Sequence, residues 1–463
     1  MSGGIRTAYA CVVCLGLGLG ALLLGAAPVH AQSAFIGIGH VPGDPESKGL
    51  AISADGSVVV GSSYYSGTAE HAYRWTATTG LRLITTPGFE LSTMAYAVSG
   101  DGLLMGGNTN NLVDSPAWSW TEAGGAVTLF NRGTIRAAST TGDVLAGYMM
   151  EGGTHSLHAV RWTGADGVRS LEPNGQTISH SEALGLTADG TLAVGQAVFP
   201  TINSLRAFLW SAATGMQNIG STDPAGHPSR AWAITRDGAV VVGGAQFLGM
   251  PLDAFRWTSA GGMQDLGSLS SIDDTDALAV SDDGNTVVGT CGKTLAGTLS
   301  GQAFVWHPAI GLRNLQTFLG ALVPTGWTLI EARGVSADGT VITGWGRNPL
   351  NQTEGWIVRL PGGVTAVGDP TPASSRSLTL AAFPNPVLGT VRLAAGGVTS
   401  AAAEPVLTIF DAAGRVARQF AAGGQAWSWN ARDASGARVP AGIYFAELRS
   451  GAARAVQKLV VLQ

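Results

Sequence analysis

Seven copies of one short pattern run through the chain and constrain its fold more than any other feature. In each copy an apolar stretch ends in Ser or Thr, and a Gly follows eight residues later. The pairs are Ser53/Gly61, Ser99/Gly107, Ser139/Gly147, Thr187/Gly195, Thr235/Gly243, Ser281/Gly289 and Ser336/Gly344. A Trp then follows in six copies, at 75, 120, 162, 210, 257 and 306, and Val358 takes its place in the seventh. Successive positions are 42 to 52 residues apart, and a period of this length indicates a repeat architecture.

The sixth copy shows the structure expected of one repeat. Residues 277–281 have the composition of a strand, 282–285 (Asp-Asp-Gly-Asn) that of a turn, and 286–290 return as a second strand. Residues 302–306 and 312–315 then supply a third and a fourth strand. Four short antiparallel strands in about 47 residues form one blade of a β-propeller, for which four to eight blades are known. The sequence predicts an all-β chain with a seven-bladed β-propeller over residues 32–360.

The first strand of nearly every copy has small residues at its first and third positions. They are Gly49/Ala51, Ala95/Ala97, Ala183/Gly185, Ala231/Ala233, Ala277/Ala279 and Ala332/Gly334. Innermost strands crowd around the axis of a propeller, so small residues there meet a packing demand. The third copy departs, with Ile135 first and Gly142-Asp143 at its turn, and we expect it to be the least regular.

Two segments compete for the outer strand of the last blade. Residues 35–39 resemble the fourth strand of other copies and precede the first complete repeat, whereas residues 364–368 follow the last one. Propellers usually complete one blade with strands from both ends of the ring. We therefore favour closure by 35–39.

The two ends of the chain carry further signals. Residues 1–31 have one cation (Arg6), an apolar stretch and Val29-His30-Ala31, as expected of a secretory signal peptide cleaved after Ala31. No later stretch is long and apolar enough to span a bilayer. We expect export through the periplasm to the cell surface or medium. Only Cys291 remains after cleavage, and we interpret it as a buried apolar residue.

A Pro-rich linker at 361–377 separates a second unit, residues 378–463, where apolar and polar residues alternate over about seven short segments, as in a small β-sandwich. Charge differs between the two parts. Residues 32–377 hold 27 acidic and 17 basic residues, a net of −10, and residues 378–463 hold 4 and 8, a net of +4. The acidic main body argues against nucleic-acid binding, which needs clustered cations.

The recurring Ser-x-Asp-Gly-x-x-Val-Val-Gly and Ala-Phe-x-Trp patterns of residues 35–360 resemble the extracellular HAF repeat family. This resemblance implies a secreted bacterial protein and assigns no catalytic residue. Residues 378–463 resemble two related families, the C-terminal sorting domain of type IX secretion cargo and the immunoglobulin-like domain of flagellar hook-capping proteins. Terminal placement on an exported chain favours the sorting domain. The markers of this resemblance are Pro384, Asn385, Pro386, Asp411, Gly414, Arg415, Gly442, Tyr444 and Lys458.

Two groups of residues are candidates for binding. Asp273, Asp274 and Asp276 could offer oxygens to Ca²⁺, although a solvated acidic loop explains them better because the spacing of a calcium loop is absent. Phe199, Phe247 and Trp327 lie in loops outside the repeat register and could form a ligand face, with capping of the propeller edge as the alternative.

The sequence shows no catalytic motif, no cofactor motif and no histidine spacing typical of a metal site. We therefore expect a non-enzymatic binding or structural scaffold. Its expected partners are a glycan or surface protein, together with the secretion machinery that the C-terminal domain would engage. The alternative is a secreted polysaccharide-active enzyme with its active site on the loop face of the propeller.

Overall fold

The computed structural model describes residues 33–462 except 42, 66–68, 85–91, 110–114, 151–155, 173–177, 201, 203, 221–226, 248–250, 271–272, 293–300, 367–378, 384–386, 388, 397–405, 413, 421–425 and 451–452. The expected signal peptide therefore lies outside the described residues, as does most of the expected linker. Contacts divide the chain into two compact units, Met1–Val367 and Gly368–Gln463.

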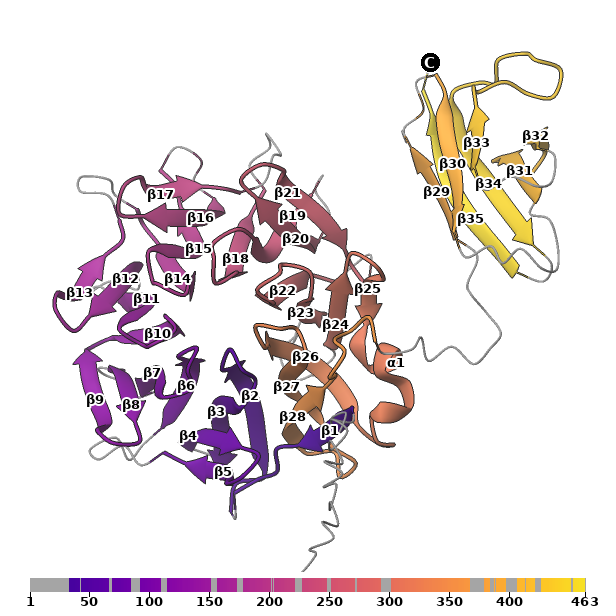
Figure 1. Cartoon of the computed structure of the whole chain (residues 1–463). Helices are drawn as coiled ribbons and strands as arrows, with labels where there is room; N and C mark the ends of the chain where they lie inside the picture. Colours follow the sequence, from indigo (N-terminus) through magenta and orange to yellow (C-terminus); the bar gives the residue numbers. More distant parts are fainter. Residues whose placement is uncertain are drawn as a thin grey trace, which may run out of the picture. The chain divides into compact units, whose positions relative to one another are not determined.

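Unit 1 is a β-propeller: its four-stranded antiparallel sheets stand around a common axis (Figure 1). In six sheets the strands are consecutive in the chain and the first lies innermost. The first three sheets are β2 (Glu46–Ile52), β3 (Val58–Tyr65), β4 (Ala69–Thr76) and β5 (Gly80–Leu83); β6 (Thr93–Val98), β7 (Leu104–Thr109), β8 (Ala117–Thr121) and β9 (Gly125–Phe130); and β10 (Gly133–Ala138), β11 (Val144–Met150), β12 (Leu157–Thr163) and β13 (Gly167–Ser170).

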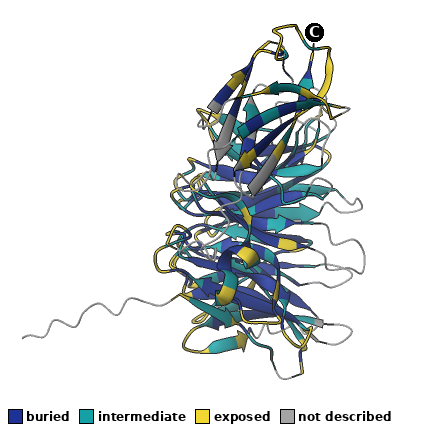
Figure 2. Ribbon diagram, turned by 90° about the vertical axis from the view of Figure 1, so that its right-hand side faces the viewer, coloured by how far each residue is buried: buried dark blue, intermediate teal, exposed yellow. Residues whose placement is uncertain are grey.

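The next three sheets are β14 (Ser181–Leu186), β15 (Leu192–Val198), β16 (Leu205–Ser211) and β17 (Gly215–Asn218); β18 (Ser229–Ile234), β19 (Val241–Gln246), β20 (Leu252–Thr258) and β21 (Gly262–Gly267); and β22 (Thr275–Val280), β23 (Val287–Cys291), β24 (Gln302–His307) and β25 (Gly311–Asn314). Buried residues run through the strands, and exposed residues gather at the turns (Figure 2).

The last sheet of unit 1 joins both ends of the ring. It consists of β26 (Thr328–Val335), β27 (Val341–Arg347), β28 (Thr353–Arg359) and, as its outer strand, β1 (Ala34–Gly37). β1 pairs antiparallel with β28, from Ala34 opposite Arg359 to Gly37 opposite Trp356. Residues 361–366 form turns rather than a strand. The outer strand thus comes from the N-terminal side of the repeats.

The Ser-x-Asp-Gly pattern builds the turn between the first and second strands. In the first sheet the Ser53 hydroxyl donates to Asp55 Oδ1 (2.6 Å) and accepts from the Val58 amide (3.0 Å). Gly102, at the same turn of the next sheet, has φ +73, and a Cβ there would lie 2.8 Å from Val58 Cγ2 of the preceding sheet. The motif is therefore a structural turn that also packs neighbouring sheets together.

The third sheet keeps the backbone turn of the other copies, with the Gly142 amide donating to the Ser139 carbonyl (3.2 Å) and φ +77 at Gly142, but its side chains differ. Asp143 accepts a hydrogen bond from the Thr141 hydroxyl (2.6 Å), whereas Ser139 still accepts from the Val144 amide (3.1 Å). The aspartate therefore reinforces the turn from a different position than in the other copies.

Buried hydroxyl groups connect one sheet to the next. An amide of the third strand donates to a Ser or Thr hydroxyl on the first strand of the following sheet, as from Ala72 to Thr93 (2.9 Å) and from Ala207 to Ser229 (3.1 Å). The same bond from Gly355 to Ser47 (3.1 Å) joins the last sheet to the first. A backbone bond from the Ala337 amide to the Ala54 carbonyl (2.8 Å) closes the ring on the side of the turns.

Two short helices interrupt the pattern before the last sheet, α1 (Leu315–Leu319) and the 3₁₀ helix η1 (Gly320–Leu322). The sequence patterns did not predict them. Leu315, Phe318 and Leu319 are buried in the largest apolar cluster of the propeller, together with Trp327 and Trp356. Within the described ranges no helix has the length and apolar composition needed to cross a membrane.

Unit 2 is a small β-sandwich of two antiparallel sheets. One consists of β29 (Thr379–Phe383), β30 (Val391–Gly396) and β33 (Ala426–Trp429), and the other of β31 (Val406–Asp411), β32 (Val416–Gln419), β34 (Gly442–Ser450) and β35 (Ala453–Val461). Both sheets contribute to one buried cluster, in which Trp429 and Tyr444 make an edge-to-face contact at 5.5 Å between ring centroids.

Candidate binding site in the central channel

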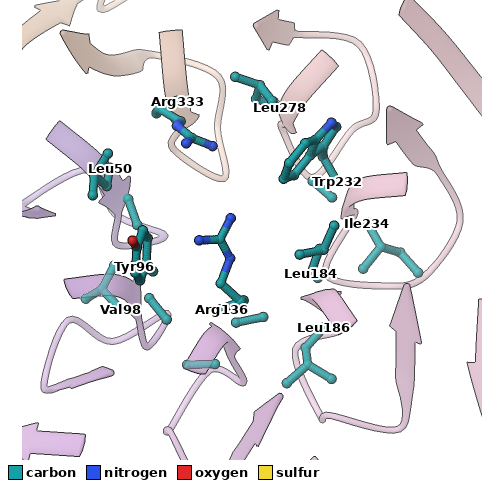
Figure 3. A pocket seen from close by; sticks show the side chains of 16 residues that line it. Leu50, Tyr96, Val98, Arg136, Leu184, Leu186, Trp232, Ile234, Leu278 and Arg333 are labelled. Atoms are coloured by element: carbon teal, nitrogen blue, oxygen red, sulfur yellow. The ribbon is translucent and has the colours of Figure 1, made fainter. Parts of the chain in front are cut away.

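Each innermost strand turns one side chain toward the axis through a β-bulge. Its register with the second strand shifts between the first and third positions of the repeat, small residues in every sheet except at Ile135 of the third. The shift leaves the residue between them without a cross-strand partner. These seven residues are Leu50, Tyr96, Arg136, Leu184, Trp232, Leu278 and Arg333. All seven line one central cavity (Figure 3).

The repeated Gly of the second strand permits this bulge. A Cβ on Gly61 would lie 1.9 Å from the Lys48 carbonyl oxygen, and one on Gly107 would lie 1.7 Å from that of Met94. No side chain fits at that distance from a backbone atom, so only Gly allows the two strands to approach so closely. The most regular feature of the sequence thus fixes the position of the residue that faces the channel, whose identity differs between copies.

The central cavity has a volume of about 220 Å³. Arg136 and Arg333 enter it from opposite sides, and Tyr96 and Trp232 form part of its wall (Figure 3). A second cavity of about 150 Å³ continues toward the turns, and Val98, Ala138 and Leu186 border both. Small residues and aliphatic side chains make up the rest of the lining of the central cavity, whereas Thr140, Thr187, Arg236 and Asp282 also line the second one.

Arg136 lacks a partner of opposite charge. Its guanidinium lies 4.4 Å from the ring centroid of Tyr96, a cation–π contact, and it makes no hydrogen bond or ion pair with any described residue. Burial, and next the positive charge of Arg333, lower the pKa of Arg136 from its ordinary value. An arginine nevertheless keeps its charge at neutral pH. Arg333, in contrast, forms an ion pair with Glu331.

Other charged side chains near the channel are paired. Arg230 binds Asp276 through two contacts, Nε to Oδ1 (2.7 Å) and Nη2 to Oδ2 (2.5 Å), and Trp232 Nε1 donates to the same carboxylate (3.0 Å). Glu182 accepts from Gln196 (2.8 Å) and lies 3.0 Å from His180 Nε2. Burial is the largest single effect on Glu182 and raises its pKa. The hydrogen bonds with His180 and Gln196 and nearby positive charges together outweigh burial, so the pKa of Glu182 lies below its usual value.

The three aspartates proposed for Ca²⁺ have separate roles. Asp276 is buried and neutralised by Arg230, and Asp274 accepts a hydrogen bond from the Leu252 amide (3.1 Å). Asp273 is half-buried. In the part of the chain that the structure describes, His, Cys, Asp and Glu side chains form no group of three or more that could hold a metal ion.

The three loop aromatics pack into the propeller. Trp327 is 8% exposed and makes an edge-to-face contact with Phe35 of β1 at 4.9 Å, so its ring packs into the propeller edge rather than facing a ligand. Phe199 and Phe247 are half-buried, and each packs against an apolar cluster that its own blade shares with the preceding blade. Packing at the propeller edge accounts for all three rings, because each covers apolar surface that would otherwise meet water.

The markers of the C-terminal unit that fall on described residues stabilise its strands and turns. The Asp411 carboxylate accepts from the Arg415 amide (2.9 Å) and pairs with its Nε (2.7 Å), and Gly414 has φ +80 in the same turn. The Tyr444 hydroxyl donates to the Pro440 carbonyl (2.9 Å). Gly442 begins β34 and Lys458 is exposed on β35. Pro384, Asn385 and Pro386 lie outside the described residues.

The sequence patterns did not single out the channel residues. The available signal was the position between the two small residues of the first strand, because its identity changes from copy to copy while its neighbours stay small. A residue that varies inside a constant framework is typical of a position that faces a cavity rather than the core.

Comparisons with known proteins assign the chain to no family. No protein-family model and no curated protein matches the chain. Solved structures similar to it include a prolyl endopeptidase (TM-score 0.46, 9% identity, 78% of this chain and 56% of that one) and the β-propeller domain of the Trilobed protease from Pyrococcus furiosus (0.44, 8%, 72% and 99%). Another is a putative TolB from Agrobacterium tumefaciens (0.36, 13%, 61% and 95%). The chain thus spans about half the length of the prolyl endopeptidase, and no functional conclusion follows from similarities this low.

Proposed function

We propose that this chain is an exported protein in which a seven-bladed propeller binds a ligand at the cell surface without transforming it. The signal-like N-terminus and the absence of a catalytic motif in the sequence support this proposal. The ring of sheets supplies a rigid frame, and the central channel supplies a site with side chains that differ from blade to blade.

The composition of the central cavity is the observation on which the proposal rests. Its lining side chains are two guanidinium groups, one phenol, one indole and aliphatic groups. Among these described lining residues there is no carboxylate, imidazole, thiol or aliphatic hydroxyl to serve as nucleophile or general base. Burial raises the pKa of Tyr96, which keeps its phenol neutral. Such a lining can hold and orient a ligand, whereas hydrolysis needs groups that it does not present.

A binding screen tests this proposal. The full chain after Ala31 is immobilised and challenged with polysaccharides and with bacterial surface proteins. We expect retention of at least one of them. Failure to retain any polysaccharide or surface protein would contradict a binding role and leave a purely structural one.

We further propose that the C-terminal sandwich is an immunoglobulin-like sorting domain that directs export or surface attachment. The turn built by Asp411, Gly414 and Arg415, three of the markers of the resemblance, supports this role. The test compares the full chain with one that ends at Val367 in a bacterium with type IX secretion. We expect the full chain outside the cell and the shortened chain in the periplasm. Equal export of both would contradict the proposal.

One observation favours the alternative, a polysaccharide-active enzyme. Burial, and next the charge of Asp265, raise the pKa of Asp253 to about 6, which suits a general acid. Glycosidases use two carboxylates of unlike pKa. Asp253 and Asp265 lie on β20 and β21, however, and line neither channel cavity. If this pair were catalytic, Asp253→Asn would abolish any polysaccharide cleavage that the wild-type chain shows.

A further inference from the structure

The central cavity contains an imbalance of charge. Two of the seven residues around it are arginines, on β10 and β26, and the other five are Leu, Tyr or Trp. The guanidinium groups of Arg136 and Arg333 point into the same space from opposite sides (Figure 3). Glu331 balances Arg333. The ionisable groups that affect Arg136 electrostatically are Tyr96, Tyr148, Glu182 and Arg333.

Arg136 brings five N–H donors into this cavity without a hydrogen-bond acceptor from the described chain. The carboxylate that affects it electrostatically, Glu182, already binds His180 and Gln196. The two guanidinium groups repel each other in this half-enclosed cavity, so their arrangement is unfavourable unless a negatively charged group lies between them. Side chains that cost stability in this way are typical of binding sites.

Tyr96 fixes the orientation of Arg136. The guanidinium stacks on the tyrosine ring, and the Tyr96 hydroxyl is itself held by a contact with Met94 Sδ at 2.8 Å. Stacking leaves the edge of the guanidinium, where its N–H groups lie, free to point into the cavity. This edge matches the two oxygens of a carboxylate or phosphate group.

We propose that the central channel binds a compact oxyanion, a carboxylate or a phosphate or sulfate ester, held between Arg136 and Arg333. The proposal rests on the binding function proposed above and names the ligand class of that site. Trp232 and Tyr96 offer flat apolar surfaces for the uncharged part of the ligand, such as a sugar ring. The cavity volume of about 220 Å³ leaves room for a ligand of the size of one acidic sugar unit.

Titration calorimetry on the full chain after Ala31 tests this inference. The probes are inorganic phosphate, sulfate and glucuronate, with glucose as the uncharged control. We expect at least one oxyanion to bind and glucose to bind at least tenfold more weakly. A preference for glucuronate would identify a carboxylate ligand, and a preference for phosphate or sulfate an ester. If no oxyanion binds the folded protein, the inference is wrong.

Two variants locate the site. Arg136→Gln keeps a side chain of similar length and removes the charge, and we expect at least tenfold weaker binding of the oxyanion. Arg82→Gln makes the same change in net charge at an exposed side chain of β5 that pairs with Glu122, and we expect unchanged binding. Equal affinity in Arg136→Gln and the wild type would overturn the inference.

Stability separates a ligand-binding role of Arg136 from a structural one. Because Arg136 faces Arg333 and lacks an acidic partner, Arg136→Gln should unfold at the same temperature as the wild type or higher. A clearly lower unfolding temperature would assign Arg136 to the framework and contradict the inference. Retention of a polysaccharide or surface protein by Arg136→Gln at wild-type strength would leave the proposed binding function intact and reject only the oxyanion site.

Discussion

Replacement of Ser47 by Ala tests how the propeller closes. Ser47 lies on the innermost strand of the first sheet and is completely buried. Its hydroxyl accepts a hydrogen bond from the Gly355 amide of the last sheet (3.1 Å) and donates one to the Gly39 carbonyl (2.7 Å), just after β1. One oxygen atom thus connects the first sheet, the last sheet and the N-terminal strand.

The expected loss follows from these two bonds. An unsatisfied buried amide costs about 1–3 kcal/mol and a lost hydrogen bond about 0.5–1.5 kcal/mol, which gives about 2–4 kcal/mol for Ser47→Ala. With an unfolding entropy of about 2.1 cal/mol/K per residue over about 330 residues, each kcal/mol lowers Tm by about 1.4 °C. The variant should therefore unfold about 3–6 °C below the wild type if the propeller unfolds in one step.

Thermal unfolding followed by tryptophan fluorescence measures this difference. The matched control is Ser259→Ala, because Ser259 is exposed and makes no hydrogen bond with a described residue. We expect the control to stay within about 0.5 kcal/mol of the wild type. Equal Tm values for Ser47→Ala and Ser259→Ala would refute the reasoning. They would mean that the hydrogen bonds of Ser47 between the first and last sheets do not contribute to the free energy of unfolding.

Four further changes test other parts of the account. Gly243→Ala would place a Cβ 1.9 Å from the Arg230 carbonyl oxygen and should cost about 3 kcal/mol or more in urea unfolding, whereas Gly164→Ala, with open space around it, should cost under about 1 kcal/mol. Asp276→Ala leaves Arg230 unpaired; because the Arg230 side chain is 30% exposed, we expect a loss of about 2–3 kcal/mol in unfolding free energy, below the value for a fully buried pair. Hydrogen bonds from the Thr191 and Ala239 amides lower the pKa values of Asp189 and Asp237. The resulting stabilisation is present above the ordinary aspartate pKa and is lost as the pH falls through the lowered values. Asp189→Asn and Asp237→Asn should therefore make the unfolding free energy less dependent on pH on the acid side. The raised pKa of Asp253, about 6, has the opposite sign: it costs stability fully above the raised value and no longer below the ordinary aspartate pKa. Asp253→Asn should therefore raise the unfolding midpoint at pH 7 and not at pH 3; an equal effect at both values would contradict the raised pKa.

Most of the fold follows from the repeated positions. Three strands of each blade are predicted by local features, because turn chemistry and alternation act between close neighbours in the chain. These features are the Ser-x-Asp-Gly turn, the alternation seen in residues 286–290 and the Ala-Phe-x-Trp pattern. The pairing of β1 with β28 was one of two alternatives in the sequence. This pairing depends on contacts between residues more than 300 positions apart, the hydrogen bond from Gly355 to Ser47 and the ring contact between Phe35 and Trp356.

The candidate site could not be predicted in the same way. A bulge needs two strands to be paired before the unpaired residue is identified, so Arg136 and Arg333 look like ordinary polar residues in the sequence. Of the two alternatives for the loop aromatics, the structure favours packing at the propeller edge for Trp327, because the segment after α1 folds this residue against Phe35. Local patterns predict elements, whereas the side chains that share a cavity depend on how distant elements meet.

The most direct test of the central claim, a propeller that binds without catalysis, is the intact mass of its ligand. Each polysaccharide retained by the full chain after Ala31 is incubated with it for a day and then analysed by mass spectrometry. The account predicts bound polysaccharide of unchanged mass, equal to that from a sample without protein. Shortened products that increase with protein concentration would show turnover and contradict the account.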